Sequence, residues 1–262
     1  MITIPHLETD ITQACQLSCV GCNHSVPLYR QRGPQSTTPQ IVERDLAVLA
    51  PMLHTAAWGA LGGEPTLSKH LVDILQVVRD SRIADTIEVW TNGLTAKTLK
   101  PSFWASLDRL VVSAYPGKLT DDDIDWIRLK CLDRGVDFRL MDERTRPNFQ
   151  NMLDPEPSDA TRTQRKFNSC FFKNFSRVVN DGFFFTCCCG PHLPVLMQGQ
   201  PFGTDGIALE GLTEQALSDY LARSTPLGAC TICAGRDGVA ARPIAWSEER
   251  DPVAWVRKSQ GL

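Results

Sequence analysis

Apolar and polar residues follow two alternating patterns along the first 142 residues. Five short apolar runs have the length and composition of buried strands, and they lie at residues 7–12, 56–61, 86–90, 109–114 and 136–141. Between these runs, apolar residues recur at helical spacing on one face. Strands that alternate with helices predict a parallel sheet with right-handed crossovers.

The four predicted helices lie at residues 39–54, 69–81, 97–107 and 121–134. Thr38 is in the capping position of the first helix and Pro39 in its first position, while Pro101 favours a later start for the third helix. Thr120 and Asp123 have the spacing of a capping box at the fourth. Five strands and four helices are too few for a closed eight-fold barrel. We therefore expect an α/β fold, an open and curved partial (β/α) barrel.

The pattern changes after residue 142. Residues 143–169 are polar, and we expect a long connection there, whereas residues 170–262 are rich in cysteine and have only short apolar runs. Asn180, Asp181 and Gly182 separate two apolar runs, which predicts a β-hairpin, and residues 213–223 predict a helix. The expected domains are a partial barrel over residues 1–150 and a linker with a small cysteine-rich module over residues 151–262.

Composition narrows the class of protein. The chain has 262 residues, 42% hydrophobic and 22% charged, with a net charge of −3. This balance favours neither nucleic acid nor an anionic membrane as a partner. No apolar run reaches the ~20 residues of a membrane helix, and the start lacks the basic and apolar regions of a signal peptide. We therefore expect a cytoplasmic protein, in which ten cysteines indicate metal ligands rather than disulfides.

Three of these cysteines lie on one short loop after the first predicted strand. Cys15 and Cys19 are separated by three residues, and Cys19 and Cys22 by two. Three thiolates at this spacing can hold three irons of a [4Fe–4S] cluster and leave the fourth iron open to a small molecule. The alternative is a zinc site, although no fourth ligand with zinc-site pairing lies close and only His24 follows at once.

Together with two further motifs, this loop resembles the radical S-adenosylmethionine (radical SAM) enzymes. Residues 62–65 read Gly-Gly-Glu-Pro after the second predicted strand, and residues 91–93 read Thr-Asn-Gly after the third. All three motifs lie at the carboxyl ends of strands, where parallel α/β sheets gather their ligands. The resemblance covers about residues 7–142.

The resemblance implies a cofactor set and a first chemical step. The three cysteines would hold a [4Fe–4S] cluster whose open iron chelates S-adenosylmethionine. One electron, from a reductant such as flavodoxin or ferredoxin, then yields a 5′-deoxyadenosyl radical that abstracts hydrogen. Gly21 departs from the family's usual pattern, because the family often has an aromatic residue at this position, against the adenine. The residues assigned to S-adenosylmethionine are Gly62, Gly63, Glu64, Pro65, Thr91, Asn92, Ser113 and Arg139.

A second set of cysteines lies downstream and resembles the single-cluster auxiliary module, called Twitch, that follows many radical SAM barrels. It is shorter than the two-cluster SPASM version. The resemblance implies a second, fully ligated [4Fe–4S] cluster, which can move electrons. Either Cys188 or Cys189 could replace Cys187, since side chains alternate along a strand, and a four-cysteine zinc site is the alternative. The predicted ligands are Cys170, Cys187, Cys230 and Cys233.

The layout also resembles the 2-deoxy-scyllo-inosamine dehydrogenases of that family, so we expect an oxidoreductase of natural product biosynthesis. Its small-molecule substrate would be polar, such as a sugar, cyclitol or nucleoside. Hydrogen abstraction from a carbinol carbon then needs a base for the hydroxyl proton, and the auxiliary cluster would accept the second electron. The candidate bases near the barrel mouth are His24, Arg139, Asp142, Glu143 and His192.

Two alternatives stay open. Many auxiliary-cluster enzymes modify peptides by crosslinking, epimerisation or oxidation, often with a leader-binding domain ahead of the barrel. We expect no room for that domain before the first strand, although a separate protein can supply it. An iron–sulfur electron carrier or a zinc scaffold would leave residues 62–65 and 91–93 unexplained.

Overall fold

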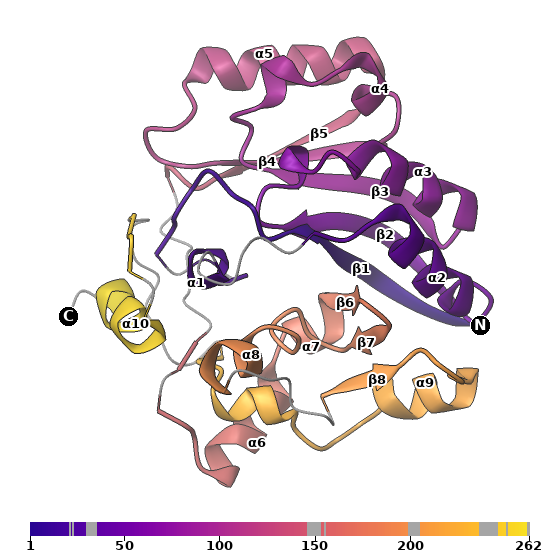
Figure 1. The fold of residues 1–262 in the computed structure, drawn as a ribbon, viewed down its shortest axis with the longest axis vertical. Coiled ribbons are helices and arrows are strands. Elements are labelled where there is room, and N and C mark those ends of the chain that lie inside the picture. Colours follow the sequence, from indigo (N-terminus) through magenta and orange to yellow (C-terminus); the bar gives the residue numbers. More distant parts are fainter. Residues whose placement is uncertain are drawn as a thin grey trace.

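The computed structural model describes residues 1–20, 22, 24–29, 36–145, 153–154, 156–198, 205–235, 246–249 and 251–260. The strands of this described part form an eight-stranded, unclosed sheet in the order β5-β4-β3-β2-β1-β6-β7-β8 (Figure 1). Strands β1 to β6 run parallel, and β7 and β8 are antiparallel to their neighbours. The strands are β1 (Ile2–Thr12), β2 (Leu53–Gly62), β3 (Ala84–Thr91), β4 (Arg109–Ala114), β5 (Asp137–Asp142), β6 (Arg177–Asn180), β7 (Phe183–Phe185) and β8 (Gly206–Ala208). The predicted open partial barrel is confirmed.

Four helices follow β1 to β4 in turn and pack on one face of the sheet. They are α2 (Pro39–Leu49), α3 (Leu71–Ser81), α4 (Pro101–Trp104) and α5 (Asp121–Arg134) (Figure 1). Their apolar stripes meet the alternate apolar residues of the strands in one core, in which Leu46 and Ile74 are fully buried. Burial of such a side chain contributes about 1.5–3 kcal/mol.

The C-terminal third folds into shorter elements around the other end of the sheet. Leu28, Tyr29 and Trp255 pack there in a second, smaller apolar cluster. The elements that enclose it, together with their neighbours, are α1 (Val26–Tyr29), α6 (Ala160–Ser169), α7 (Phe172–Phe175), α8 (Leu193–Gln198), α9 (Glu214–Leu221), a 3₁₀ turn (Gly228–Thr231) and α10 (Pro252–Gln260). Among the described residues, no helix has the length and apolar character to cross a membrane.

Local chemistry explains where several elements begin and turn. The Thr38 side chain accepts a hydrogen bond from the backbone of Ile41, with Pro39 at the first helical position. Thr120 and Asp123 form the predicted capping box of α5. The predicted hairpin is β6–β7, in which Asp181 and Gly182 both have positive φ, as a tight hairpin turn requires.

Three predicted bounds are wrong. The first helix ends at Leu49, because Leu53 already pairs with Ile2 as the start of β2. The third predicted helix is split at Pro101 into a 3₁₀ turn (Ala96–Thr98) and α4. The segment expected to be a connection contains α6, which Asp159 caps and which buries Phe167. Its polar composition hid a narrow apolar face.

The face of the sheet opposite α2–α5 is charged at alternate positions of its strands. His6, Glu8 and Asp10 lie on this face of β1, and all three are buried. Glu88 of β3 and Arg109 of β4 continue the row, because they are paired in the sheet register. We call this surface the inner face.

Candidate functional site

The predicted iron-binding cysteines lie on a loop directly after β1, which we call the three-cysteine loop. The backbone N–H of Cys22 donates to the carbonyl of Cys19 at 3.4 Å, and Leu17 N–H donates to the Cys15 thiol at 3.4 Å. Burial raises the pKa of Cys19, and the neighbouring Cys22 and Cys15 thiolates raise it further. The three thiols are therefore close enough to interact electrostatically, as ligands of one group would be. Gly21, where the adenine contact was in question, lies outside the described residues.

Two glycines let the end of β2 come close to the base of this loop. The backbone N–H of Gly63 donates to Thr12 O at 2.7 Å, and that of Glu64 donates to Ala14 O at 2.8 Å. A Cβ atom on Gly63 would lie 2.3 Å from the carbonyl oxygen of Ala14, and one on Gly62 would lie 2.6 Å from that of Thr12. Any larger residue at these positions would push the loop away from β2.

The buried carboxylate of Glu64 joins the Gly-Gly-Glu-Pro motif to the Thr-Asn-Gly motif. It accepts hydrogen bonds from Thr91 Oγ1 at 2.7 Å, from Asn92 N–H at 2.8 Å and from the side chain and backbone of Thr66. Burial raises the pKa of Glu64, and these hydrogen bonds oppose that shift. Asn92 in turn donates to Gln16 Oε1 at 3.1 Å, and its amide nitrogen is 3.9 Å from the Cys15 sulfur. Pro65 begins a short 3₁₀ turn behind Glu64.

The site residues predicted on and after β4 and β5 lie in two different environments. Ser113 is on the inner face near the end of β4, and it bonds to Tyr115. Burial raises the pKa of Tyr115 well above its ordinary value, as do the nearby charges of Cys19, Cys22 and Glu143. Ser113 and Glu143 are thus connected to the three-cysteine loop through Tyr115.

Asp142 and Arg139 have other partners. Asp142 Oδ1 is 2.8 Å from Arg144 Nε, which ties it to a surface ion pair. Arg139 is 59% exposed and its nearest ion-pair partner is Asp137 at 3.5 Å. Both candidate bases are thus engaged in ion pairs with neighbouring charged side chains.

Two other candidate bases, His24 and His192, meet at a buried carboxylate that the sequence prediction missed. His192 Nε2 is paired with Asp10 Oδ2, and His24 Nδ1 is 3.2 Å from Asp10 Oδ1. The hydroxyl of Tyr29 is 3.1 Å from the other ring nitrogen of His192. The side chains of Asp10 and His192 are each 5% exposed. Burial opposes the charged form of Asp10, but the two histidines outweigh it and hold the pKa of Asp10 well below its usual value.

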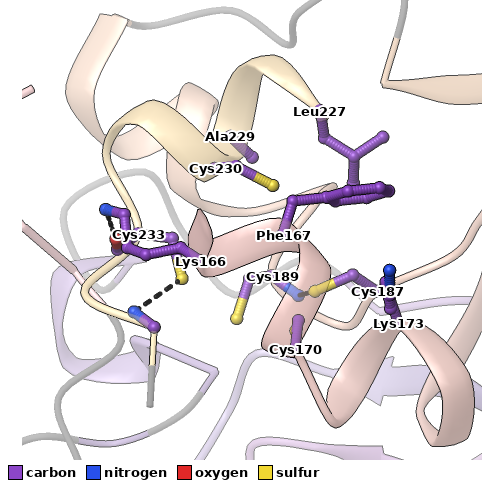
Figure 2. Close-up of a pocket in the computed structure, with 11 residues that line it drawn as sticks. Lys166, Phe167, Cys170, Lys173, Cys187, Cys189, Leu227, Ala229, Cys230 and Cys233 are labelled. Atoms are coloured by element: carbon purple, nitrogen blue, oxygen red, sulfur yellow. Dashed lines mark hydrogen bonds between the residues drawn. The ribbon is translucent and has the colours of Figure 1, made fainter. Parts of the chain in front are cut away.

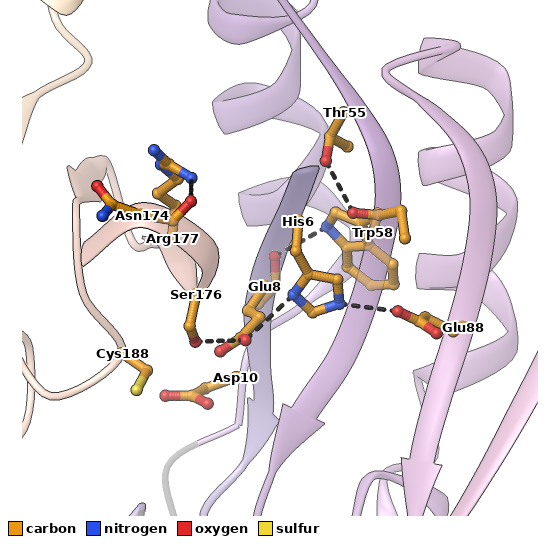
Figure 3. Close-up of polar contacts among 12 residues, drawn as sticks. His6, Glu8, Asp10, Thr55, Trp58, Glu88, Asn174, Ser176, Arg177 and Cys188 are labelled. Carbon is orange, nitrogen blue, oxygen red and sulfur yellow. Dashed lines mark hydrogen bonds and ion pairs between the residues drawn. The ribbon is translucent and has the colours of Figure 1, made fainter. Parts of the chain in front are cut away.

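A second buried network lies deeper on the inner face (Figure 3). His6 is between two carboxylates, with Nδ1 3.1 Å from Glu8 and Nε2 2.8 Å from Glu88. Ser176 donates to Glu8 from the segment before β6, and Arg109 Nη1 is 3.3 Å from Glu88. Burial lowers the pKa of His6, but the two carboxylates outweigh it and raise that pKa to about 9.

Five downstream cysteines face one small cavity, which we call the auxiliary cavity (Figure 2). Burial and the neighbouring Cys187 and Cys233 thiolates raise the pKa of Cys230 to about 12, so these thiols interact with one another. Lys166, Phe167 and Leu227 complete the wall. The cysteines around the cavity are Cys170, Cys187, Cys189, Cys230 and Cys233.

The three consecutive cysteines bring their sulfur atoms together, because all three Sγ atoms lie within 4.8 Å of one another. Cys187 and Cys189 both line the auxiliary cavity, whereas Cys188 does not. The Cys188 thiol faces Ser176 and Glu8 on the inner face (Figure 3). The alternation expected of a strand does not apply, because these cysteines lie in a turn after β7, and this turn brings Cys189 to the cavity in addition to the four predicted ligands.

A short C-terminal segment covers the three-cysteine loop. Trp246 forms an isolated β-bridge with Cys19, and Ser247 N–H donates to Ser18 O at 3.0 Å. The ring of Trp246 packs edge-on against Tyr115, and the Lys118 ammonium lies over it at 4.5 Å. Residues 246–249 therefore shield one side of the loop.

Sequence comparisons give short matches to known proteins. No protein-family profile matches the sequence. The GTP 3′,8-cyclase of Photorhabdus laumondii is 35% identical over 92 residues, which are 34% of this chain and 26% of the cyclase. The probable GTP 3′,8-cyclase of Pyrococcus abyssi is 30% identical over 111 residues, 42% of this chain and 34% of that protein. The matches thus span about a quarter to a third of the cyclases' own length.

Solved structures give a longer match. BtrN in complex with AdoMet and 2-DOIA has a TM-score of 0.56 and 14% identity, over 94% of this chain and 98% of BtrN. Streptococcus suis SuiB bound to the precursor peptide SuiA has a TM-score of 0.45 and 16% identity, over 83% of this chain and 65% of SuiB. BtrN is a radical SAM enzyme, and its match extends through both the sheet and the cysteine-rich C-terminal third. The chain therefore has the fold of the radical SAM enzymes.

Proposed function

We propose that this chain is a radical SAM enzyme that oxidises a small polar substrate, such as a sugar, cyclitol or nucleoside. The observation that carries the proposal is the joining of three motifs at the carboxyl ends of β1, β2 and β3. Glu64 bonds the second motif to the third, and the backbone of Gly63 and Glu64 bonds the second to the loop that follows β1. A protein that only carries electrons would not need these three motifs to be bonded to one another.

The residues present fit the cofactors. Cys15, Cys19 and Cys22 would hold a [4Fe–4S] cluster, while residues 62–65 and 91–93 would position S-adenosylmethionine beside it. When bound, this pair supplies a 5′-deoxyadenosyl radical, which takes a hydrogen atom from the substrate. Trp246 and the frame around Glu64 keep water from one side of the site.

The charged inner face supplies the acid–base chemistry. A carbinol that loses a hydrogen atom from carbon must also lose its hydroxyl proton before a carbonyl can form. The cluster of Asp10, His24 and His192 is a buried group close to the three-cysteine loop, and it can accept this proton. We therefore assign proton removal to this cluster and not to Asp142 or Arg139, which are held in surface ion pairs.

The auxiliary cavity supports net oxidation. Its predicted ligands Cys170, Cys187, Cys230 and Cys233 all face one space, so they fit a second [4Fe–4S] cluster. When bound, this cluster supplies an acceptor for the second electron of the substrate. The segment with Cys187 to Cys189 runs from the cavity to the inner face, which supports electron transfer from a substrate at the inner face to an acceptor in the cavity.

Anaerobic reconstitution tests the first step. The reconstituted chain, with dithionite and S-adenosylmethionine, should form 5′-deoxyadenosine, and Cys19→Ser should abolish it. Cys131→Ala is the matched control, because Cys131 is a buried cysteine on α5, in the main core and outside both sites. About eight irons per chain support two clusters, while about four irons plus one zinc would contradict the electron-acceptor role.

The substrate class needs a separate measurement. A panel of sugars, cyclitols and nucleosides deuterated at carbinol carbons should transfer deuterium into 5′-deoxyadenosine for at least one member. Transfer from a labelled peptide and from none of the small molecules would favour a peptide-modifying enzyme instead.

A further inference from the structure

Asp10, His24 and His192 bring three metal-binding atoms together from distant parts of the chain. Asp10 is near the end of β1, His24 follows the three-cysteine loop, and His192 precedes α8. One ligand atom from each residue lies within 4.8 Å of the other two. The side chains are 5%, 16% and 5% exposed, so water reaches them poorly.

We propose that these three residues bind a divalent first-row transition metal in addition to any iron–sulfur cluster. Two imidazoles and one carboxylate suit zinc, iron or manganese, whereas calcium and magnesium prefer oxygen ligands alone. Three protein ligands leave coordination positions open, as in catalytic and not structural metal sites.

Two buried polar atoms without a hydrogen bond support a missing ligand. The 3.2 Å contact between His24 Nδ1 and Asp10 Oδ1 does not have hydrogen-bond geometry, and neither atom has another hydrogen-bond partner among the described residues. A buried carboxylate oxygen and a buried ring nitrogen that form an ion pair but no hydrogen bond are incompletely satisfied, which is costly. A metal ion between them would satisfy both atoms at once.

The surroundings of His192 fit a metal ligand as well. A metal-binding histidine usually has its second ring nitrogen held by a further polar group, which fixes the tautomer. The Tyr29 hydroxyl is 3.1 Å from His192 Nδ1 and also donates to the His192 carbonyl at 3.4 Å. It can therefore hold the proton on Nδ1 and leave the lone pair of Nε2 for the metal.

This site has a clear chemical use if the proposed function is correct. A substrate hydroxyl bound to the metal's open position would become more acidic, as water does on zinc. The hydroxyl proton would then pass to the Asp10 oxygen that does not bind the metal when the adjacent carbon loses its hydrogen atom. The metal binding itself does not depend on that function.

Zinc binding to the cluster-loaded protein tests the site. After zinc is added and the excess removed, elemental analysis should find one zinc per chain with the iron content unchanged. Zinc-edge X-ray absorption should show nitrogen and oxygen ligands at about 2.0–2.1 Å and no sulfur at about 2.3 Å. Sulfur ligation, or no retained zinc, would overturn the proposal.

Variants identify the ligands. Asp10→Asn and His192→Gln should each lower the bound zinc at least about tenfold without loss of iron. His6→Gln is the matched control, because His6 is also a buried histidine on the inner face that is held by carboxylates. Equal zinc in Asp10→Asn and the unaltered chain overturns the site. Formation of 5′-deoxyadenosine is measured on the same samples. If zinc binds as expected but no 5′-deoxyadenosine forms, the proposed function is contradicted and the metal site is not.

Discussion

The carboxylate of Glu64 joins the second and third motifs of the candidate site by hydrogen bonds. Replacement of one of its two oxygens by an NH₂ group tests this role. In Glu64→Gln, an NH₂ group replaces an oxygen that accepts from Thr91 or from the backbone of Asn92. A donor then faces a donor in a buried site, which costs about 1–3 kcal/mol. We expect a lower thermal midpoint and less 5′-deoxyadenosine for Glu64→Gln. Glu210→Gln, at an exposed glutamate, should change neither.

His6 gives a prediction for the dependence of stability on pH. Its pKa in the folded chain is raised to about 9, chiefly by Glu8 and Glu88 against the effect of burial, with Arg109 beyond Glu88. The resulting stabilisation is fully present below the unfolded pKa of about 6.5 and is lost as pH rises through about 9.

The His6→Gln variant isolates this contribution. We expect the unaltered chain to exceed His6→Gln in unfolding free energy at about pH 6, with the difference falling by up to about 3 kcal/mol at about pH 10. Denaturant unfolding of both proteins at the two pH values measures it. A difference that does not depend on pH would show that His6 is neutral in the folded chain.

At the scale of elements, the segment after β7 decides which cysteines can reach the auxiliary cavity. Cys187 faces the cavity and Cys188 faces Ser176 on the inner face. We therefore expect Cys187→Ser to lose about four of about eight irons and Cys188→Ser to retain them all. Iron analysis of the reconstituted proteins measures this. Loss of iron from Cys188→Ser would mean that Cys188, whose sulfur lies 3.9 Å from that of Cys189, is itself a cluster ligand.

The candidate site and its surroundings illustrate what the sequence can and cannot predict. The three motifs were predictable, because chain order and strand ends place them at one edge of a parallel sheet. The place of Asp10 in the site was not predictable, since Asp10 lies inside a strand and its partner His192 is 182 positions away in the sequence. The choice among Cys187, Cys188 and Cys189 also depends on side-chain direction, which spacing leaves open. The helix α6 was hidden by its polar composition.

At the scale of the whole molecule, the sheet and the main core continue across residue 150. Strand β6 pairs with β1 in the middle of the sheet, through Leu7 with Arg177 and Glu8 with Val178. The main core also contains Val179, Phe184 and Leu217 from the C-terminal third. Barrel and cysteine-rich module are therefore structurally joined, although the two predicted domains remain a prediction.

This continuity predicts that residues 1–150 alone will not fold. Without β6, the central strand β1 becomes an open edge, and exposed edges of parallel strands promote aggregation. Glu8 also loses Ser176, and each lost apolar contact in the core removes about 1.5–3 kcal/mol of burial. We expect this fragment to aggregate, as measured by size-exclusion chromatography. The full chain with Cys170→Ser and Cys230→Ser keeps these contacts but loses cluster ligands, so it should remain monodisperse and unfold cooperatively. A soluble fragment with a cooperative transition would show instead that the barrel is stable without its sixth strand.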